Sequence, residues 1–201
     1  MDYLFLKEKL QSKIVSPRIL LSNVKFLNES LRSTSAFMDP INLPFYYHLG
    51  KQLDSVNILQ IGVQGTSAYI GPCILQSCKS VKNYTAIDEQ LDPHSVNFVA
   101  SNLRAHATSE TKTSVYLNHR ANVSWDVIIV SCSVVKDKFN EYLKYGWDNL
   151  KEEGLLVADY ISESRPTTAP DLNGAFLKFC RVKNREPVIY ETRNGVGIIT
   201  R

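Results

Sequence analysis

The sequence lacks the features that would assign it at once to several common classes of protein. Its 23 Lys and Arg exceed its 20 Asp and Glu by only three charges, and no Lys- or Arg-rich run accompanies them. The charge therefore gives only weak support for nucleic-acid binding, which stays open. The four cysteines match no paired zinc spacing, and a disulfide framework is not expected in a chain of 201 residues. We expect buried free thiols at Cys73, Cys78, Cys132 and Cys180.

A long apolar segment is also missing near the start of the chain. The opening residues, MDYLFLKEKL, are interrupted by Lys7, Glu8 and Lys9. They lack the apolar core of a signal peptide and cannot span a bilayer. We therefore expect a protein of a reducing, aqueous compartment, the cytoplasm, with no membrane partner.

What the sequence does contain is enough apolar material for one folded domain. Apolar residues make up 44% of the chain and charged residues 21%, which is typical of a globular protein. Helical spacing predicts helices over residues 3–15 and 19–31, followed by an irregular connector over residues 33–44. We divide the chain into a helical extension with its connector, residues 1–44, and an α/β domain, residues 45–201. The helices of the extension could hold a second copy of the chain or an assembly partner.

The α/β domain is indicated by a change of pattern. From Val56, short β-branched runs alternate with longer amphipathic segments, as in a parallel sheet covered by helices. Near the end, Asn194-Gly195 joins two β-rich pieces and predicts a hairpin. The expected fold is a doubly wound, mostly parallel seven-stranded sheet with a terminal antiparallel hairpin. Its expected strands are 57–62, 83–88, 113–117, 126–131, 154–159, 187–192 and 196–200, and its helices are 45–53, 70–78, 94–107, 136–150 and 175–181.

In such a sheet the ligand crevice lies beyond the carboxyl ends of the strands. The segment VNILQIGVQGTSAY places Gly62 and Gly65 directly after an apolar strand, where backbone amides can approach a ligand. The second strand ends in Asp88 and Glu89, and a carboxylate there suits the paired hydroxyls of a ribose. A plain strand-to-helix turn, or a helix cap at Asp88, would explain the same residues without a ligand.

This order of motifs resembles the class I S-adenosylmethionine-dependent methyltransferases, over roughly residues 45 to 201. The resemblance implies that residues 60–66, Gln-Ile-Gly-Val-Gln-Gly-Thr, meet the amino-acid part of S-adenosylmethionine and that Asp88 binds its ribose. Residues 125–130, Trp-Asp-Val-Ile-Ile-Val, match the family's fourth strand. Residues 150–159, from Leu150 to Asp159, match the family's charged loop, the apolar strand after it and the aspartate that ends this strand. The closing hairpin matches the antiparallel strand with which the family ends its sheet. Small O-methyltransferases similar to catechol O-methyltransferase, and enzymes that modify sugars or macrolides, resemble the chain most.

The chain departs from the family at several positions. Gln60 stands where the family usually has an acid, and Gln64 and Thr66 replace glycines; both glutamines could still hydrogen-bond a zwitterion. Metal-dependent members of the family hold Mg²⁺ through carboxylates, and the matching positions here are Ser131, Asp159 and Tyr160. One carboxylate remains, so we expect no metal. The residues expected to bind the cofactor are Gln60, Gly62, Gln64, Gly65, Thr66, Asp88, Glu89, Asn118 and Ser131.

Two residues are candidates for catalysis. Asp159 could act as a base or orient an acceptor hydroxyl, although it could equally be a turn residue. His119 has a suitable pKa for a base but could lie at the rim of the site. Asn118 could read the edge of the adenine. Cys132 follows a strand end, and a buried thiol explains it better than a nucleophile.

The sequence therefore predicts an S-adenosylmethionine-dependent methyltransferase, O-directed and metal-independent, acting on a small-molecule or sugar-type acceptor that it does not identify. The alternative is a methyltransferase-like domain that has lost catalysis and serves as a binding or assembly module. The divergent loop favours that alternative. An NAD-dependent oxidoreductase is a weaker third option, because the glycine spacing misses its fingerprint.

Overall fold

A computed structural model describes residues 42–118, 123–131, 136–161, 172–190 and 195–201. The helices expected at 3–15 and 19–31 lie outside these ranges. The helices are α4 (Leu43–Gly50), the 3₁₀ helix η2 (Gly65–Tyr69), α5 (Ile70–Ser77), α6 (Pro93–His106), α7 (Lys136–Asn149) and α8 (Leu172–Val182). The strands are β1 (Asn57–Ile61), β2 (Asn83–Ile87), β3 (Lys112–Tyr116), β4 (Trp125–Val130), β5 (Leu150–Asp159), β6 (Val188–Tyr190) and β7 (Val196–Thr200).

The strands form one seven-stranded sheet in the order β3-β2-β1-β4-β5-β7-β6. The first five strands pair in parallel, whereas β7 runs antiparallel to both β5 and β6. The predicted doubly wound sheet with an antiparallel end is confirmed. Strand ends differ by a residue or so from the prediction, except in β5. That strand begins at Leu150 instead of Gly154, with a register shift against β4.

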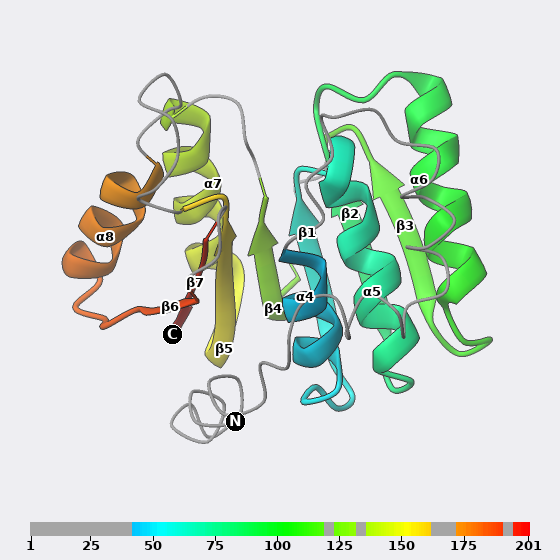
Figure 1. Cartoon of the computed structure of the whole chain (residues 1–201), viewed down its shortest axis with the longest axis horizontal. Helices are drawn as coiled ribbons and strands as arrows, with labels where there is room; N and C mark the ends of the chain where they lie inside the picture. The colour runs from blue at the N-terminus through cyan, green and yellow to red at the C-terminus, as the bar shows by residue number, and fades with distance from the viewer. Residues whose placement is uncertain (1–41, 119–122, 132–135, 162–171, 191–194) are drawn as a thin grey trace.

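Helices cover both faces of the sheet, with α4, α5 and α6 on one side and α7 and α8 on the other (Figure 1). Alternate strand residues face opposite sides. Ile58 therefore packs with the first set of helices, while Leu59 and Ile61 pack with the second. Phe139 and Leu143 of α7 are fully buried. Each such side chain stabilises the fold by about 1.5–3 kcal/mol.

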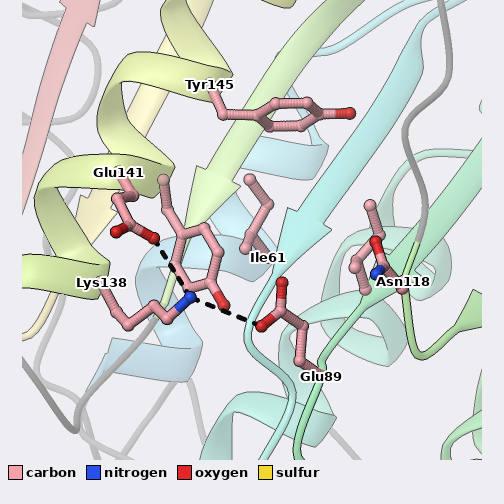
Figure 2. A pocket seen from close by; sticks show the side chains of 8 residues that line it. Ile61, Glu89, Asn118, Lys138, Glu141 and Tyr145 are labelled. Atoms are coloured by element: carbon pink, nitrogen blue, oxygen red, sulfur yellow. Dashed lines mark ion pairs between the residues drawn. The ribbon is translucent and has the colours of Figure 1, made fainter.

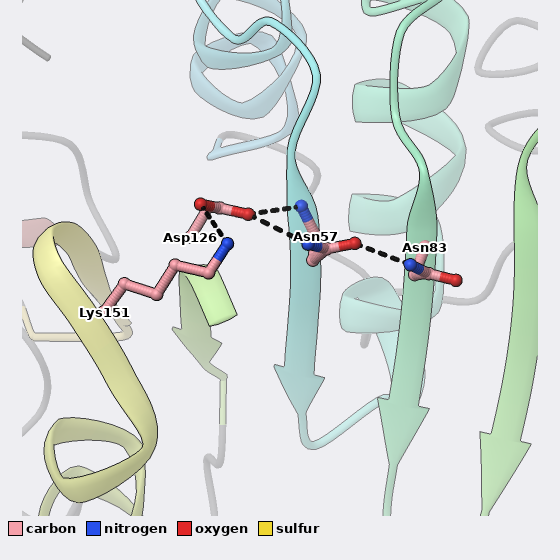
Figure 3. Close-up of polar contacts among 4 residues, drawn as sticks. All are labelled: Asn57, Asn83, Asp126 and Lys151. Carbon is pink, nitrogen blue, oxygen red and sulfur yellow. Dashed lines mark hydrogen bonds and ion pairs between the residues drawn. The ribbon is translucent and has the colours of Figure 1, made fainter. Parts of the chain in front are cut away.

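A ladder of polar side chains fixes the strands at their amino ends (Figure 3). The Asp126 carboxylate in β4 accepts hydrogen bonds from the Asn57 backbone N–H at 2.8 Å and from its side-chain amide at 3.2 Å. Asn83 in β2 donates to the Asn57 side-chain oxygen at 2.6 Å. Lys151 pairs with Asp126 at 2.8 Å. Four strands, β1, β2, β4 and β5, are thus linked by side chains at the edge of the sheet opposite to the expected crevice.

The described helices include none that is both long and apolar enough to cross a membrane. In the same residues, the cysteines Cys73, Cys78 and Cys180 are free thiols and buried, as predicted. Cys132 lies outside the described residues.

Candidate functional site

The carboxyl ends of β1 and β2 form the expected crevice. β1 lies between β2 and β4, whose chain connections leave in opposite directions, so the strand order reverses there. Gly62 has a φ of 87° and Gly65 a φ of 58°, both in the left-handed region that glycine adopts without strain. The Gly62 N–H donates to the Ile87 carbonyl at 2.8 Å, which joins the loop to β2. Thr66 lies in η2.

Asp88 lies directly against this loop. One of its carboxylate oxygens accepts from the Val63 backbone N–H at 2.9 Å. The other accepts from the Gln90 backbone N–H at 2.9 Å and from the Gln64 side chain at 3.4 Å. The structure therefore brings Gly62, Gln64 and Asp88 together as predicted. The Gln64 contact is long and exposed, so a ligand hydroxyl could replace it.

Gln60 and Ser131 were also predicted to bind the cofactor, and the structure places both inside the protein. Gln60 is 1% exposed, and its amide nitrogen donates to the carbonyls of Gly62 at 2.9 Å and of Ser67 at 2.7 Å. Its oxygen accepts from the Tyr84 hydroxyl at 2.7 Å. Ser131 is 3% exposed and donates to the Gly62 carbonyl as well. We name the buried cluster of Gln60, Tyr84 and Ser131 the Gln60 network. It lies under the loop and hydrogen-bonds the Gly62 and Ser67 carbonyls.

A cavity of about 350 Å³ opens between the strand ends and α7 (Figure 2), and the two chain neighbours of Asp88, Ile87 and Glu89, line it. This volume falls in the range of small-molecule sites. Ile61 and Ile87 give it an apolar wall, and Glu89 and Asn118 contribute a carboxylate and an amide. The α7 side is made by Lys138, Glu141, Tyr142 and Tyr145.

Sequence reasoning missed this wall of α7. Its residues recur at positions 138, 141, 142 and 145, a stripe next to the buried side chains Phe139 and Leu143. Lys138 pairs with Glu141 at 3.1 Å and with Glu89 of the facing loop at 3.6 Å. The hydrogen bond with Glu141, helped by both negative charges, raises the pKa of Lys138. Lys138 therefore stays charged and links the two sides of the cavity.

Asp159 ends β5 as predicted, but its described contacts are structural. It is 3% exposed and accepts hydrogen bonds from the Asn42 side chain and from the Tyr160 N–H at 2.8 Å. Burial raises the pKa of Tyr46 well above its ordinary value, and the negative charge of Asp159 adds to the effect. Tyr46 is fully buried in α4. Asn42 carried no signal in the sequence, since it lies 117 positions from Asp159.

The prediction of His119 as a base finds no test in this geometry, because that residue lies outside the described residues. In the described part of the chain, no group of three or more His, Cys, Asp or Glu could hold a metal ion.

No protein-family model matches the sequence, and a search of curated proteins finds no match either. Solved structures do match. An O-methyltransferase from Bacillus cereus in complex with SAH is 12% identical, with a TM-score of 0.60 over 98% of this chain and 97% of that one. The O-methyltransferase TomG from Streptomyces achromogenes, involved in tomaymycin synthesis and solved with SAM, is 12% identical, with a TM-score of 0.59 over 97% and 95%.

A third similar structure is a methyltransferase that is not named as an O-methyltransferase. The precorrin-6y C5,15-methyltransferase from Geobacter metallireducens is 14% identical, with a TM-score of 0.54 over 77% of this chain and 84% of that one. At such identities the similarity establishes the fold. The chain has the fold of the class I S-adenosylmethionine-dependent methyltransferases, as its motifs predicted.

Proposed function

We propose that the protein is an S-adenosylmethionine-dependent methyltransferase that holds the adenosyl half of its cofactor at the carboxyl ends of β1, β2 and β3. The observation that carries the proposal is the position of Asp88, whose side chain contacts the loop after β1 and whose chain neighbours Ile87 and Glu89 line the cavity. An acid beside a base-sized cavity, at the strand-order reversal of this fold, is the arrangement that an adenosyl group requires.

Asp88 would bind the two ribose hydroxyls. A carboxylate offers about four acceptor positions, and two are taken by the short bonds from Val63 and Gln90. The third partner, Gln64, is at 3.4 Å and can be displaced. Hydroxyl donors make short, strong bonds to an ionised carboxylate, so the exchange would be favourable.

The adenine would lie in the cavity beside α7. Ile61 and Ile87 offer an apolar surface to one face of the base, and the Asn118 amide can both donate to and accept from its polar edge. Lys138 and Glu89 would separate slightly to admit it, at little cost, because surface ion pairs contribute only about 0–1 kcal/mol.

The bound cofactor would supply an already activated methyl group on a sulfonium. The protein then needs chiefly to hold an acceptor in line with it, and positioning alone can supply about 7–11 kcal/mol in favourable systems. Asp159 and His119 are the proposed bases. Asp159 would first have to exchange its Asn42 partner for an acceptor hydroxyl.

Two of the similar structures are O-methyltransferases, and one is involved in tomaymycin synthesis, which supports an O-directed reaction on a small molecule. The reaction is proposed to be metal-independent, because only one carboxylate remains at the positions that match the family's metal ligands. The third shows that the fold alone does not choose the acceptor atom. Sugar-type acceptors fit this proposal, as does a site of action in the cytoplasm. The extension, residues 1–44, is proposed as the place where a second copy or a partner would bind.

Thermal unfolding with S-adenosylhomocysteine (SAH) tests the proposal. A ligand at 100 times its Kd should add about 2.7 kcal/mol to the stability. Asp88→Ala should abolish the gain, whereas Glu110→Gln, an exposed acid before the amino end of β3, should keep it. If neither SAH nor S-adenosylmethionine stabilises the wild-type protein, the proposal is wrong.

The second candidate is an inactive methyltransferase-like binding module. It is favoured by the Gln60 network, because the Gly62 and Ser67 carbonyls of the loop already accept hydrogen bonds from Gln60 within the protein. Transfer of tritium from labelled S-adenosylmethionine to a pool of small hydroxylated acceptors distinguishes the two. Label transfer supports the enzyme, whereas binding of the cofactor without transfer to any acceptor favours the module.

A further inference from the structure

We infer that this crevice binds only the adenosyl half of the cofactor and that the described residues offer no dedicated partners to the amino-acid half. The inference rests on the proposed function and specifies the ligand class of the same site, namely 5′-thioadenosines with or without an amino-acid chain. It comes from the Gln60 network, which lies beneath the loop expected to meet the amino acid.

The carbonyl groups of this loop that the network contacts are already saturated. A carbonyl oxygen has two lone pairs. The Gly62 oxygen accepts from Gln60 and from Ser131, and the Ser67 oxygen accepts from Gln60 and from the Ile70 N–H. An ammonium group needs hydrogen-bond acceptors, and neither carbonyl oxygen has a lone pair left to accept from it.

The orientation of Gln60 makes the loop still less suitable for an ammonium. Burial raises the pKa of Tyr84 well above its ordinary value, so its hydroxyl stays protonated and donates to the Gln60 oxygen at 2.7 Å. The Gln60 NH₂ must then face the loop. The side of Gln60 that faces the loop is therefore a donor, bonded to the Gly62 and Ser67 carbonyls, and not the acceptor that an ammonium needs.

Charge is missing from the loop as well. The eleven residues 60–70, QIGVQGTSAYI, contain no Asp, Glu, Lys or Arg. Among the residues that the structure describes, Asp88 is the carboxylate in contact with the loop, and it is committed to the Val63 and Gln90 amides and to the proposed ribose. The zwitterion of an amino acid would thus gain little here over its hydration in water.

The consequence is an unusual tolerance for truncated ligands. SAH and 5′-methylthioadenosine share the thioadenosine and differ chiefly in the amino-acid chain. If this chain stays largely in water, the two ligands should bind with nearly equal affinity. A site that does pair the zwitterion would prefer SAH by about tenfold or more for each charged hydrogen bond that it makes.

Isothermal titration calorimetry of the full chain with SAH and with 5′-methylthioadenosine tests the inference. We expect Kd values within tenfold of each other. A preference for SAH of tenfold or more overturns the inference and leaves the proposed function standing. Binding of neither ligand refutes the proposed function, and the inference with it.

Asp88→Ala provides the matched comparison. Since both ligands carry the same ribose, the variant should weaken SAH and 5′-methylthioadenosine by the same factor. A selective loss of SAH would show that Asp88 reads the amino group, which also overturns the inference.

Discussion

The Gln60 network makes a quantitative prediction about stability. Gln60→Leu keeps the approximate size of the side chain but removes the acceptor of the Tyr84 hydroxyl, which is fully buried. The carbonyls of Gly62 and Ser67 each keep their second donor. The loss is therefore dominated by one unsatisfied hydroxyl, and we expect a destabilisation of about 1–3 kcal/mol.

Tyr84→Phe should cost a similar amount, since it leaves the Gln60 oxygen without its donor. In the double variant both polar partners are gone, and the desolvation cost is largely removed. We expect the double variant to be more stable than the sum of the single changes by about 1–2 kcal/mol.

Urea unfolding measures the four free energies of unfolding in this cycle. Gln64→Leu is the control, an exposed glutamine of the same loop that should change the stability by less than about 0.5 kcal/mol. Additive effects of the two single substitutions, within about 0.5 kcal/mol, would refute the buried hydrogen bond.

Three other predictions concern stability and reactivity. Gly50→Ala places a Cβ 2.9 Å from a backbone oxygen of α5, and we expect it to lower the free energy of unfolding in urea by about 1–3 kcal/mol. The Cβ of Gly65→Ala meets nothing within 4 Å, so that variant should lose only about 1–2 kcal/mol, from its left-handed backbone. Burial lowers the pKa of His106 below 6.5, so the folded protein binds this proton less readily than the unfolded chain. Stability measured against pH should fall below about pH 6.5, and His106→Gln should flatten that slope; an unchanged slope contradicts the assignment. Burial raises the pKa of the Cys73 thiol, and it raises the pKa of the Cys180 thiol to about 12. Because the thiolate is the reactive form, both cysteines should resist iodoacetamide at pH 8 until urea unfolds the chain.

The sequence predicted the sheet well because its strands are marked locally. Short β-branched runs such as residues 126–131 are distinct from the amphipathic helices between them, and Asn194-Gly195 marked the closing hairpin. The start of β5 was placed four residues late, because Lys151, Glu152 and Glu153 are exposed in the strand and look like a charged loop.

The site was harder to predict because it depends on which way each side chain points. Gln60 alternates with Leu59 and Ile61, which face α7 and α8, so strand periodicity alone puts Gln60 on the α5 side with Ile58. That signal was present in the sequence and indicates a buried glutamine instead of a cofactor ligand. The partner of Asp159 carried no such signal, because Asn42 reaches it only through the tertiary fold.

The central claim is that an adenosyl group occupies the crevice beside Asp88, and a titration of the ¹⁵N-labelled protein with SAH, followed by amide NMR, tests it most directly. The account predicts shifts of the Val63 and Gln90 amides, which donate to Asp88, and of the Asn118 side-chain amide, while Asn57 and Asn83 at the opposite edge stay unchanged. Saturating SAH that leaves Val63, Gln90 and Asn118 unperturbed would contradict it.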